Sequence, residues 1–226
     1  MNRGALIDRI LTTLNDSPVA PVFWTRAEVA DVIQEGMEVM AEEVMALKRS
    51  AFLGLKPGSL YYRTRGIAKD FRVPYRLWFS NTNKKLIPVT VEQLDGFHMQ
   101  WSTVTGDPEY WAPMGYDWFT IFPHPSAGGG VLRVDYLAWP RELGGDDDKP
   151  EFPDSDHDAL VTYGVYDGLL KRWAAPEAMT IFASFLEKIG EAKPRSGVNQ
   201  LNGRTWQKET GSANGFRTGI GWRENR

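Results

Sequence analysis

Few residues in this sequence could do acid–base or metal chemistry. The three histidines are His98, His124 and His157, and the absence of cysteine excludes thiolate nucleophiles and thiolate zinc sites. His124 stands between two prolines, where we interpret it as a turn residue. His157 follows Asp154 and Asp156, which allows a metal site of two carboxylates and one imidazole. We favour a helix N-terminus instead, because its positive dipole end attracts acidic residues.

Two further segments have only part of a ligand-binding pattern. The acids at residues 146–148 are consecutive and Lys149 follows them, whereas calcium loops alternate their acids, so we expect a solvated loop. Residues 128–130 are glycines, but they lead into a strand pattern and not into a phosphate-binding helix N-terminus. Sequence motifs of nucleotide-binding, serine-hydrolase and zinc-protease sites are absent. We therefore expect no enzymatic activity, no cofactor and no metal site.

The composition is that of a folded protein without a membrane span. Hydrophobic residues make up 42% of the 226 residues, and no apolar run reaches the length of about 18 that a membrane helix needs. The N-terminal residues lack the apolar core of a signal peptide, and the absence of cysteine suits a reducing cytoplasm.

The N-terminal part of the chain has the apolar periodicity of helices. Apolar residues over Leu6–Leu14 predict a short helix that ends near Asn15. Thr25 and Glu28 form a capping-box pattern, and the apolar stripe after them predicts a long helix that ends near Phe52.

The middle of the chain changes to short runs of aromatic and β-branched residues between turn signals, without intervening helices. In one run, Leu132, Val134 and Tyr136 would face an apolar interior. Arg133 and Asp135 alternate with them and would face solvent, as in an antiparallel sheet with one wet face. The pattern predicts a small antiparallel sandwich or barrel.

Helical periodicity returns after Pro153. Acidic residues there could cap a helix from His157 to Trp173, in which Gly164 and Gly168 would let a second helix approach closely. A last helix would begin at Pro176. The residues expected to be buried are Tyr163, Tyr166, Leu170 and Trp173 in the first helix and Phe182, Phe185, Leu186 and Ile189 in the second.

The predicted fold class is therefore α+β. Two N-terminal helices in residues 1–54 and two C-terminal helices in residues 143–193 would close into one helical bundle. Residues 55–142 would form an inserted antiparallel β-sandwich or barrel domain, and residues 194–226 an extended C-terminal arm.

The expected arm differs from the rest of the chain in charge. It carries +4 within a chain of net charge −3, so residues 1–193 carry −7. Aromatic residues are scattered among its glycines and arginines, and we interpret it as a segment that becomes ordered on a partner, not as a solvated terminus. The candidate docking residues are Arg204, Trp206, Phe216, Arg217, Ile220 and Trp222.

An ordered series of short elements runs through the second half of the chain. Trp101 precedes a Thr-Gly-x-Pro-x-Tyr element at residues 105–110. A strand pattern ending in Pro-x-Pro at residue 125, a strand pattern ending at Tyr136, an acidic loop and two helices follow. In this order of elements, the sequence over residues 25–193 resembles the head-to-tail adaptor (connector) proteins of tailed bacteriophages.

The resemblance implies a structural virion protein in the neck of the particle, assembled in the host cytoplasm. Such adaptors form a homo-oligomeric ring, commonly a dodecamer, beneath the portal protein, and present a platform for the tail or nozzle protein. A C-terminal arm clasps the portal. Genomic DNA would pass through the ring during packaging and ejection without sequence-specific binding, and an acidic body would repel its phosphates.

Two other classes of protein fit parts of the pattern. A tail-tube, tail-terminator or baseplate-hub component would share the ring but contain more strand and less helix. A carbohydrate-binding or hydrolytic virion protein would use the aromatic β-region as a platform for sugars.

Overall fold

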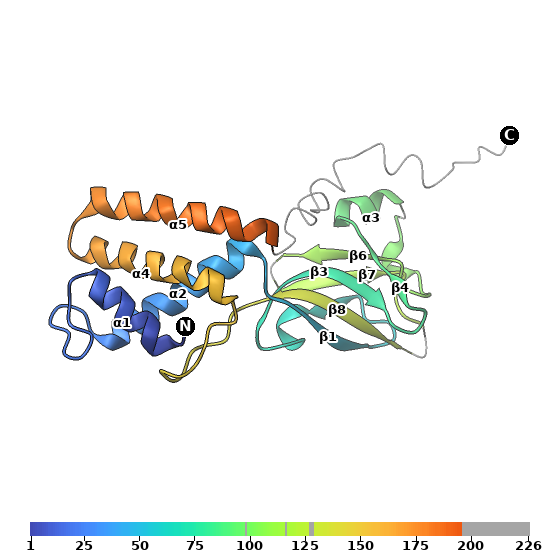
Figure 1. Cartoon of the computed structure of the whole chain (residues 1–226). Coiled ribbons are helices and arrows are strands. Elements are labelled where there is room, and N and C mark those ends of the chain that lie inside the picture. The colour runs from blue at the N-terminus through green and yellow to red at the C-terminus, as the bar shows by residue number, and fades with distance from the viewer. Residues whose placement is uncertain (98, 116, 127–128, 196–226) are drawn as a thin grey trace. The chain divides into compact units, whose positions relative to one another are not determined.

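The computed structural model describes residues 1–97, 99–115, 117–126 and 129–195 (Figure 1). These residues form five α-helices and eight strands, which confirms the predicted α+β class. They divide into two units that are described separately. The helical unit comprises residues 1–47 and 138–195, and the β-unit comprises residues 48–137.

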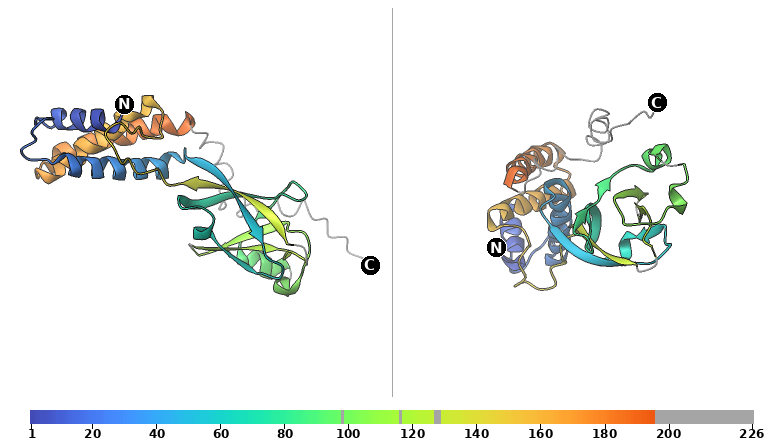
Figure 2. Two further views of the ribbon diagram at one scale, coloured as in Figure 1. Left: turned by 90° about the horizontal axis from the view of Figure 1, so that it is seen from below. Right: turned by 90° about the vertical axis from the view of Figure 1, so that its right-hand side faces the viewer.

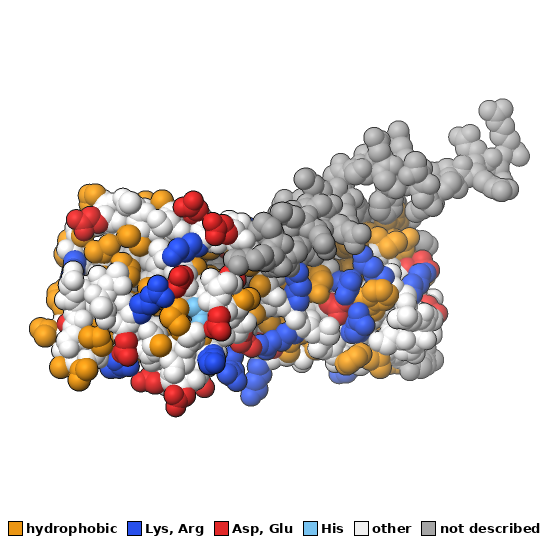
Figure 3. All heavy atoms as spheres, in the orientation of Figure 1, with side chains coloured by type: hydrophobic (Ala, Val, Ile, Leu, Met, Phe, Trp, Pro, Cys, Tyr) orange, Lys and Arg blue, Asp and Glu red, His pale blue; other side chains and the backbone are white. Residues whose placement is uncertain are grey.

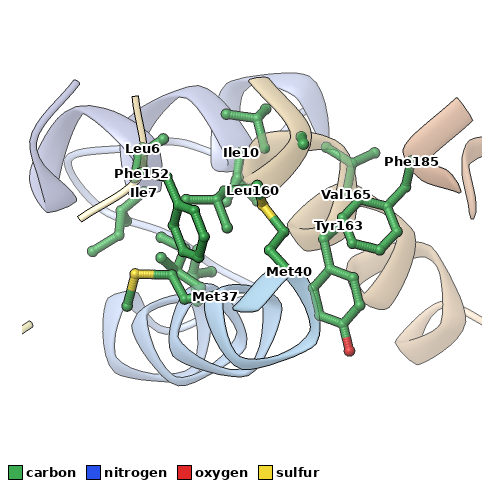
Figure 4. Close-up of a cluster of buried hydrophobic side chains, with 14 of the residues drawn as sticks. Leu6, Ile7, Ile10, Met37, Met40, Phe152, Leu160, Tyr163, Val165 and Phe185 are labelled. Atoms are coloured by element: carbon green, nitrogen blue, oxygen red, sulfur yellow. The ribbon is translucent and has the colours of Figure 1, made fainter. Parts of the chain in front are cut away.

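The helical unit is built from four helices around one hydrophobic core. They are α1 (Arg3–Thr13), α2 (Arg26–Val44), α4 (His157–Lys171) and α5 (Ala175–Arg195). The predicted capping box of α2 is confirmed, since Glu28 N–H donates to Thr25 Oγ1 at 3.1 Å and Thr25 N–H donates to Glu28 Oε2 at 2.9 Å. The core residues labelled in Figure 4 are Leu6, Ile7, Ile10, Met37, Met40, Phe152, Leu160, Tyr163, Val165 and Phe185.

The close approach predicted for the α4 glycines is confirmed. Ile10 and Leu14, at the end of α1, lie where side chains at Gly164 and Gly168 would otherwise be. A side chain at either position would therefore force Ile10 or Leu14 to shift in this well-packed contact between α1 and α4.

Three residues expected to be buried in the last two helices are exposed. Leu186 is 49% exposed because it follows the buried Phe185 by one residue and so points about 100° around the helix. Leu170 is 38% exposed in the last turn of α4, and Trp173 is 93% exposed because the helix ends at Lys171.

The long helix predicted to reach Phe52 ends at Val44, where Met45 has a φ of 50°. The next element is strand β1 (Lys48–Leu55), whose side chains alternate between exposed and half-buried up to its last residue. Its backbone pairs antiparallel with β8 (Gly130–Ala138) along its whole length. The helical prediction was wrong here because β1 depends on this distant partner.

The β-unit contains two four-stranded sheets. The first has the order β1-β8-β3-β4, and the second has the order β2-β7-β6-β5. The remaining strands are β2 (Tyr61–Arg63), β3 (Phe71–Phe79), β4 (Lys84–Lys85), β5 (Ile87–Pro88), β6 (Tyr110–Met114) and β7 (Trp118–Phe122).

Two features of the β-unit contradict the prediction of an antiparallel region without helices. Strand β5 pairs parallel to β6, and helix α3 (Val91–Phe97) follows β5. The start of α3 has a second capping arrangement, since Gln93 N–H donates to Thr90 Oγ1 at 3.3 Å and Thr90 N–H to Gln93 Oε1 at 2.9 Å.

The predicted alternation in β8 is confirmed for its apolar residues. Leu132 and Val134 are completely buried, and Tyr136 is 3% exposed. The expectation that Asp135 faces solvent was wrong, because Asp135 is 1% exposed and is covered by the arginines paired with it.

Candidate functional site

The most exposed aromatic residue described in the structure stands at the end of α4. Trp173 is 93% exposed and has a φ of 60°. Its N–H donates to the Leu170 carbonyl at 2.9 Å, and the N–H of Ala174 donates to the Leu169 carbonyl at 3.1 Å. These two bonds define a Schellman motif, in which the left-handed position is usually glycine. A tryptophan there has an unfavourable backbone conformation and no burial to offset it.

The loop between α1 and α2 lies at the same end of the helical unit as the end of α4 (Figures 1 and 2). It carries further exposed apolar residues. Val19 and Val22 are more than 90% exposed, and Phe23 is about half exposed. We call Val19, Val22, Phe23 and Trp173 the aromatic tip. Exposed apolar groups gathered in this way are typical of protein-interaction surfaces.

Asp16 fixes the backbone of the loop. Its Oδ1 accepts hydrogen bonds from the N–H groups of Ser17 at 2.8 Å and Val22 at 3.0 Å. Its Oδ2 accepts those of Phe23 at 3.0 Å and Trp24 at 3.1 Å. The hydrogen bond from Val22 is the largest cause of a pKa lowered to about 2, and the other three act in the same direction against desolvation. The exposed side chains therefore stand on an ordered loop.

Two cations connect the loop to α4. Lys171 Nζ lies 4.5 Å from the centroid of the Trp24 ring and donates to Glu28 Oε1 at 2.9 Å. The guanidinium carbon of Arg172 lies 5.6 Å from the centroid of the Phe23 ring. These contacts are cation–π pairs, and they hold the two parts of the aromatic tip before any partner binds.

A cavity of about 260 Å³ lies beside this connection. Its lining includes apolar groups of Trp24, Val32 and Leu14 together with Lys171 and Asp167. Burial, followed by the charge of Glu35, raises the pKa of Asp167. The cavity combines apolar walls with a few polar groups, which is the usual character of a pocket for a partner side chain.

The histidines considered for chemistry do not come together. His98 lies outside the described residues. His124 is 2% exposed in the β-unit beside Trp101, and burial lowers its pKa. His157 is 1% exposed at the start of α4 with its Nε2 3.0 Å from the Phe152 carbonyl, and burial is the largest cause of its lowered pKa.

The acidic loop at residues 146–148 is solvent-exposed, as expected, and its backbone also contacts the N-terminus of α1. The carbonyls of Asp146 and Asp148 accept hydrogen bonds from the N–H groups of Gly4 at 2.9 Å and Arg3 at 2.7 Å. The carboxylate of Asp146 also pairs with Arg26 at 3.3 Å. Within the described residues, no three acidic or histidine side chains are grouped to hold a metal ion.

The predicted docking residues of the arm lie outside the described residues, and their role stays a prediction. They are Arg204, Trp206, Phe216, Arg217, Ile220 and Trp222. Sequence periodicity assigned Trp173 to a buried stripe and therefore missed the aromatic tip. The sequence feature that could have predicted the aromatic tip is the segment between the two N-terminal helices, which contains the apolar residues Val19, Val22 and Phe23 outside any helical pattern.

Residues 1–209 match the family described as SU10 adaptor protein. No curated protein matches the chain. None of the helices in the described part of the chain is long and apolar enough to cross a membrane.

Proposed function

Because the chain belongs to the SU10 adaptor protein family, a family of structural phage proteins, we propose that it links the phage head to the tail. Membership makes it a virion component that interacts with other virion proteins. In the proposed role it forms a homo-oligomeric ring beneath the portal protein, with a helical bundle that carries the β-domain. The opposite side of the ring receives the tail or nozzle protein.

The observation that carries the proposal is Trp173. Its large apolar side chain is exposed, and its backbone occupies a position where glycine would be more stable. Residues kept in unfavourable conformations at the surface are typical of functional sites. Tryptophan is also among the residues that contribute most to binding energy at protein interfaces. In the proposed role, the aromatic tip docks on an apolar site of the portal or tail protein.

The C-terminal arm supplies a second attachment in this proposal. Its charge of +4 and its scattered aromatic residues suit a segment that clasps the portal. Genomic DNA passes through the ring without sequence-specific binding, and acidic residues on the channel wall repel its phosphates. A structure of the assembled ring would show which residues line the channel wall. A wall dominated by Lys and Arg would overturn the proposed repulsion of DNA.

Electron microscopy of the full chain mixed with purified portal, and separately with the tail protein, tests the docking role. Wild-type protein is expected to form rings on one of these partners. Trp173→Ala should weaken docking at the tip about tenfold or more. Leu186→Ala, which truncates an exposed residue of α5, is the control and should dock normally. Equal docking by both variants would overturn the role of the tip.

A chain that ends at Lys193 tests the arm separately. Loss of portal rings with this shorter chain supports the clasp, whereas unaffected rings refute it. The aromatic tip is intact in the shortened chain, so the two attachments are tested independently.

One observation favours a second function, the binding of carbohydrate. A groove of about 560 Å³ in the β-unit is lined by Tyr61, Trp118, Met114 and Glu92, and both aromatic residues are nearly half exposed. Aromatic rings beside a carboxylate can bind sugars by stacking and hydrogen bonding. Binding of the purified protein to a glycan array, lost in Trp118→Ala, would support this function.

A further inference from the structure

The negative charge of the chain is confined to one of its two units. Residues 1–47 and 138–193 of the helical unit carry a net charge of −11, whereas residues 48–137 carry +4. Residues 1–193, which were expected to be acidic as a whole, therefore include the basic β-unit. Figure 3 shows Lys and Arg side chains gathered over the β-unit, with hydrophobic side chains between them.

One face of the first sheet places two arginines on a tryptophan. The guanidinium carbons of Arg76 in β3 and Arg133 in β8 lie 5.4 and 5.2 Å from the centroid of the Trp78 ring. Phe52 of β1 is the register partner of Arg133, and its side chain is 69% exposed. We call Phe52, Arg76, Trp78 and Arg133 the Arg–Trp face.

A buried carboxylate orients both arginines of this face. Asp135 accepts hydrogen bonds from Arg76 Nε at 2.7 Å, Arg133 Nε at 3.1 Å and Ser50 Oγ at 2.6 Å. Burial opposes its ionisation, but these three donors outweigh burial and lower its pKa. Two cations and one anion leave the cluster positive.

The arginines retain donors for a partner. Each uses its Nε and Nη2 atoms on Asp135. In the described part of the chain, the Nη1 group of neither arginine has a hydrogen-bond partner. The site is therefore preorganised to bind carboxylates.

Helix α2 carries a complementary surface. Exposed acidic residues follow one another at intervals of four, three and four residues, which places them on one side of the helix. After Arg26 the helix contains no basic residue. We call this set the acidic stripe: Asp31, Glu35, Glu38 and Glu42.

We propose that the Arg–Trp face of one copy of the chain binds the acidic stripe of a second copy. The inference rests on the proposed function, which brings copies of the chain side by side. Carboxylates one helical turn apart are separated by about 6 Å. Neighbouring strands lie about 4.8 Å apart. Two successive carboxylates can therefore each meet one arginine, Arg76 on β3 and Arg133 on β8.

The composition of the Arg–Trp face favours a protein partner over DNA. Arginine and tryptophan dominate the binding energy of protein interfaces, and the exposed Phe52 ring adds apolar contact that a phosphate backbone cannot match. Opposite net charges on the two surfaces also steer copies into this orientation. The contact is therefore expected to weaken as ionic strength rises.

Sedimentation velocity of the full chain at two ionic strengths tests the proposal. Glu38→Arg and Phe52→Asp alter exposed side chains, so the fold is expected to persist, and each should weaken self-association about tenfold or more. Glu187→Arg makes the same charge change as Glu38→Arg on α5 and should leave association unchanged. Combining Glu38→Arg with Arg133→Glu should restore association, since the two charges are then exchanged and still attract each other.

Three results would overturn the inference. They are a wild-type chain that stays monomeric at every concentration, unchanged association of both Glu38→Arg and Phe52→Asp, and loss of duplex-DNA binding by Arg133→Glu with normal association. The last result would assign the face to DNA. Docking of Trp173→Ala on portal or tail protein is measured separately, so failure of the proposed function would be recognised by its own experiment.

Discussion

Gly164 of α4 faces Ile10 of α1 so closely that a Cβ atom at Gly164 would lie 2.4 Å from Ile10 Cδ1. Ile10 is completely buried. Gly190 of α5, in contrast, has open space where its side chain would be. A side chain at Gly164 would therefore clash with α1, whereas a side chain at Gly190 would meet no neighbour.

This difference predicts opposite effects of the same substitution. Gly164→Ala should lower the free energy of unfolding by about 1–2 kcal/mol, because overpacking outweighs the better helix propensity of alanine. Gly190→Ala should raise it by about 0.5–1 kcal/mol through helix propensity alone. Urea titrations monitored by circular dichroism measure both. A double mutant with Ile10→Val, which removes the clashing Cδ1, should recover part of the loss at Gly164.

Trp173→Gly should stabilise the helical unit while it weakens docking. Glycine removes the cost of about 1 kcal/mol that a side chain has in the left-handed conformation. Thermal unfolding and ring formation on the partner are the two measurements. A variant that is both less stable and fully able to dock would contradict the role given to this residue.

Asp16→Ala should release the loop that carries Phe23. Amide hydrogen exchange at Val22, Phe23 and Trp24 should become faster, while exchange in the core of α4 stays slow. Asp147→Asn, an exposed loop position, is the control and should change none of these rates. Unchanged exchange at all three amides would show that other contacts hold the loop.

The same carboxylate predicts the effect of acid on the loop. The pKa of Asp16 in the folded chain is about 2, below its ordinary value of 3.8. Its contribution is therefore fully present above about pH 4 and is lost as the pH falls through about 2. Amide chemical shifts of Val22 and Phe23 followed by NMR should move over this window in the wild type and not in Asp16→Asn.

The buried histidines predict a second pH dependence, in a higher window. Burial lowers the pKa of His124 below 6.5, so the unfolded chain binds a proton more readily than the folded chain. Stability should therefore fall as the pH drops below about 6.5, with a slope of at most about 1.4 kcal/mol per pH unit for this one residue. His124→Phe should flatten the dependence for the β-unit. His157 acts with the same sign in the helical unit.

Local signals in the sequence were enough to predict much of the helical unit. Thr25 and Glu28, only three residues apart, form the capping box that marks the start of α2. Gly164 and Gly168 indicated a close contact with another helix, but they did not show which helix it is. The start of α3 has a similar local signal in Thr90 and Gln93, which strand propensity obscured.

The remaining features depend on pairs of residues far apart in the chain. Ser50 and Asp135 are 85 residues apart, and no periodicity relates them, so neither β1 nor the Arg–Trp face could be predicted from local pattern. Trp173 was misplaced because its distance from Tyr166 continues a helical stripe, whereas the helix ends two residues earlier. The docking role predicted for the residues of the C-terminal arm is based on composition alone.

The insertion of the β-unit between the two halves of the helical unit has a consequence for synthesis on the ribosome. Residues 48–137 emerge as one uninterrupted segment. Helix α2, in contrast, cannot pack against α4 and α5 until these helices have been synthesised, more than 100 residues later. Pairing of Lys48 with Leu137 at the ends of β1 and β8 brings residues 47 and 138 together. The late helices then meet the early ones as if a short connection joined them, which removes most of the entropic cost of closing so long a loop. The nascent chain is thus expected to complete its β-unit first and its helical unit last.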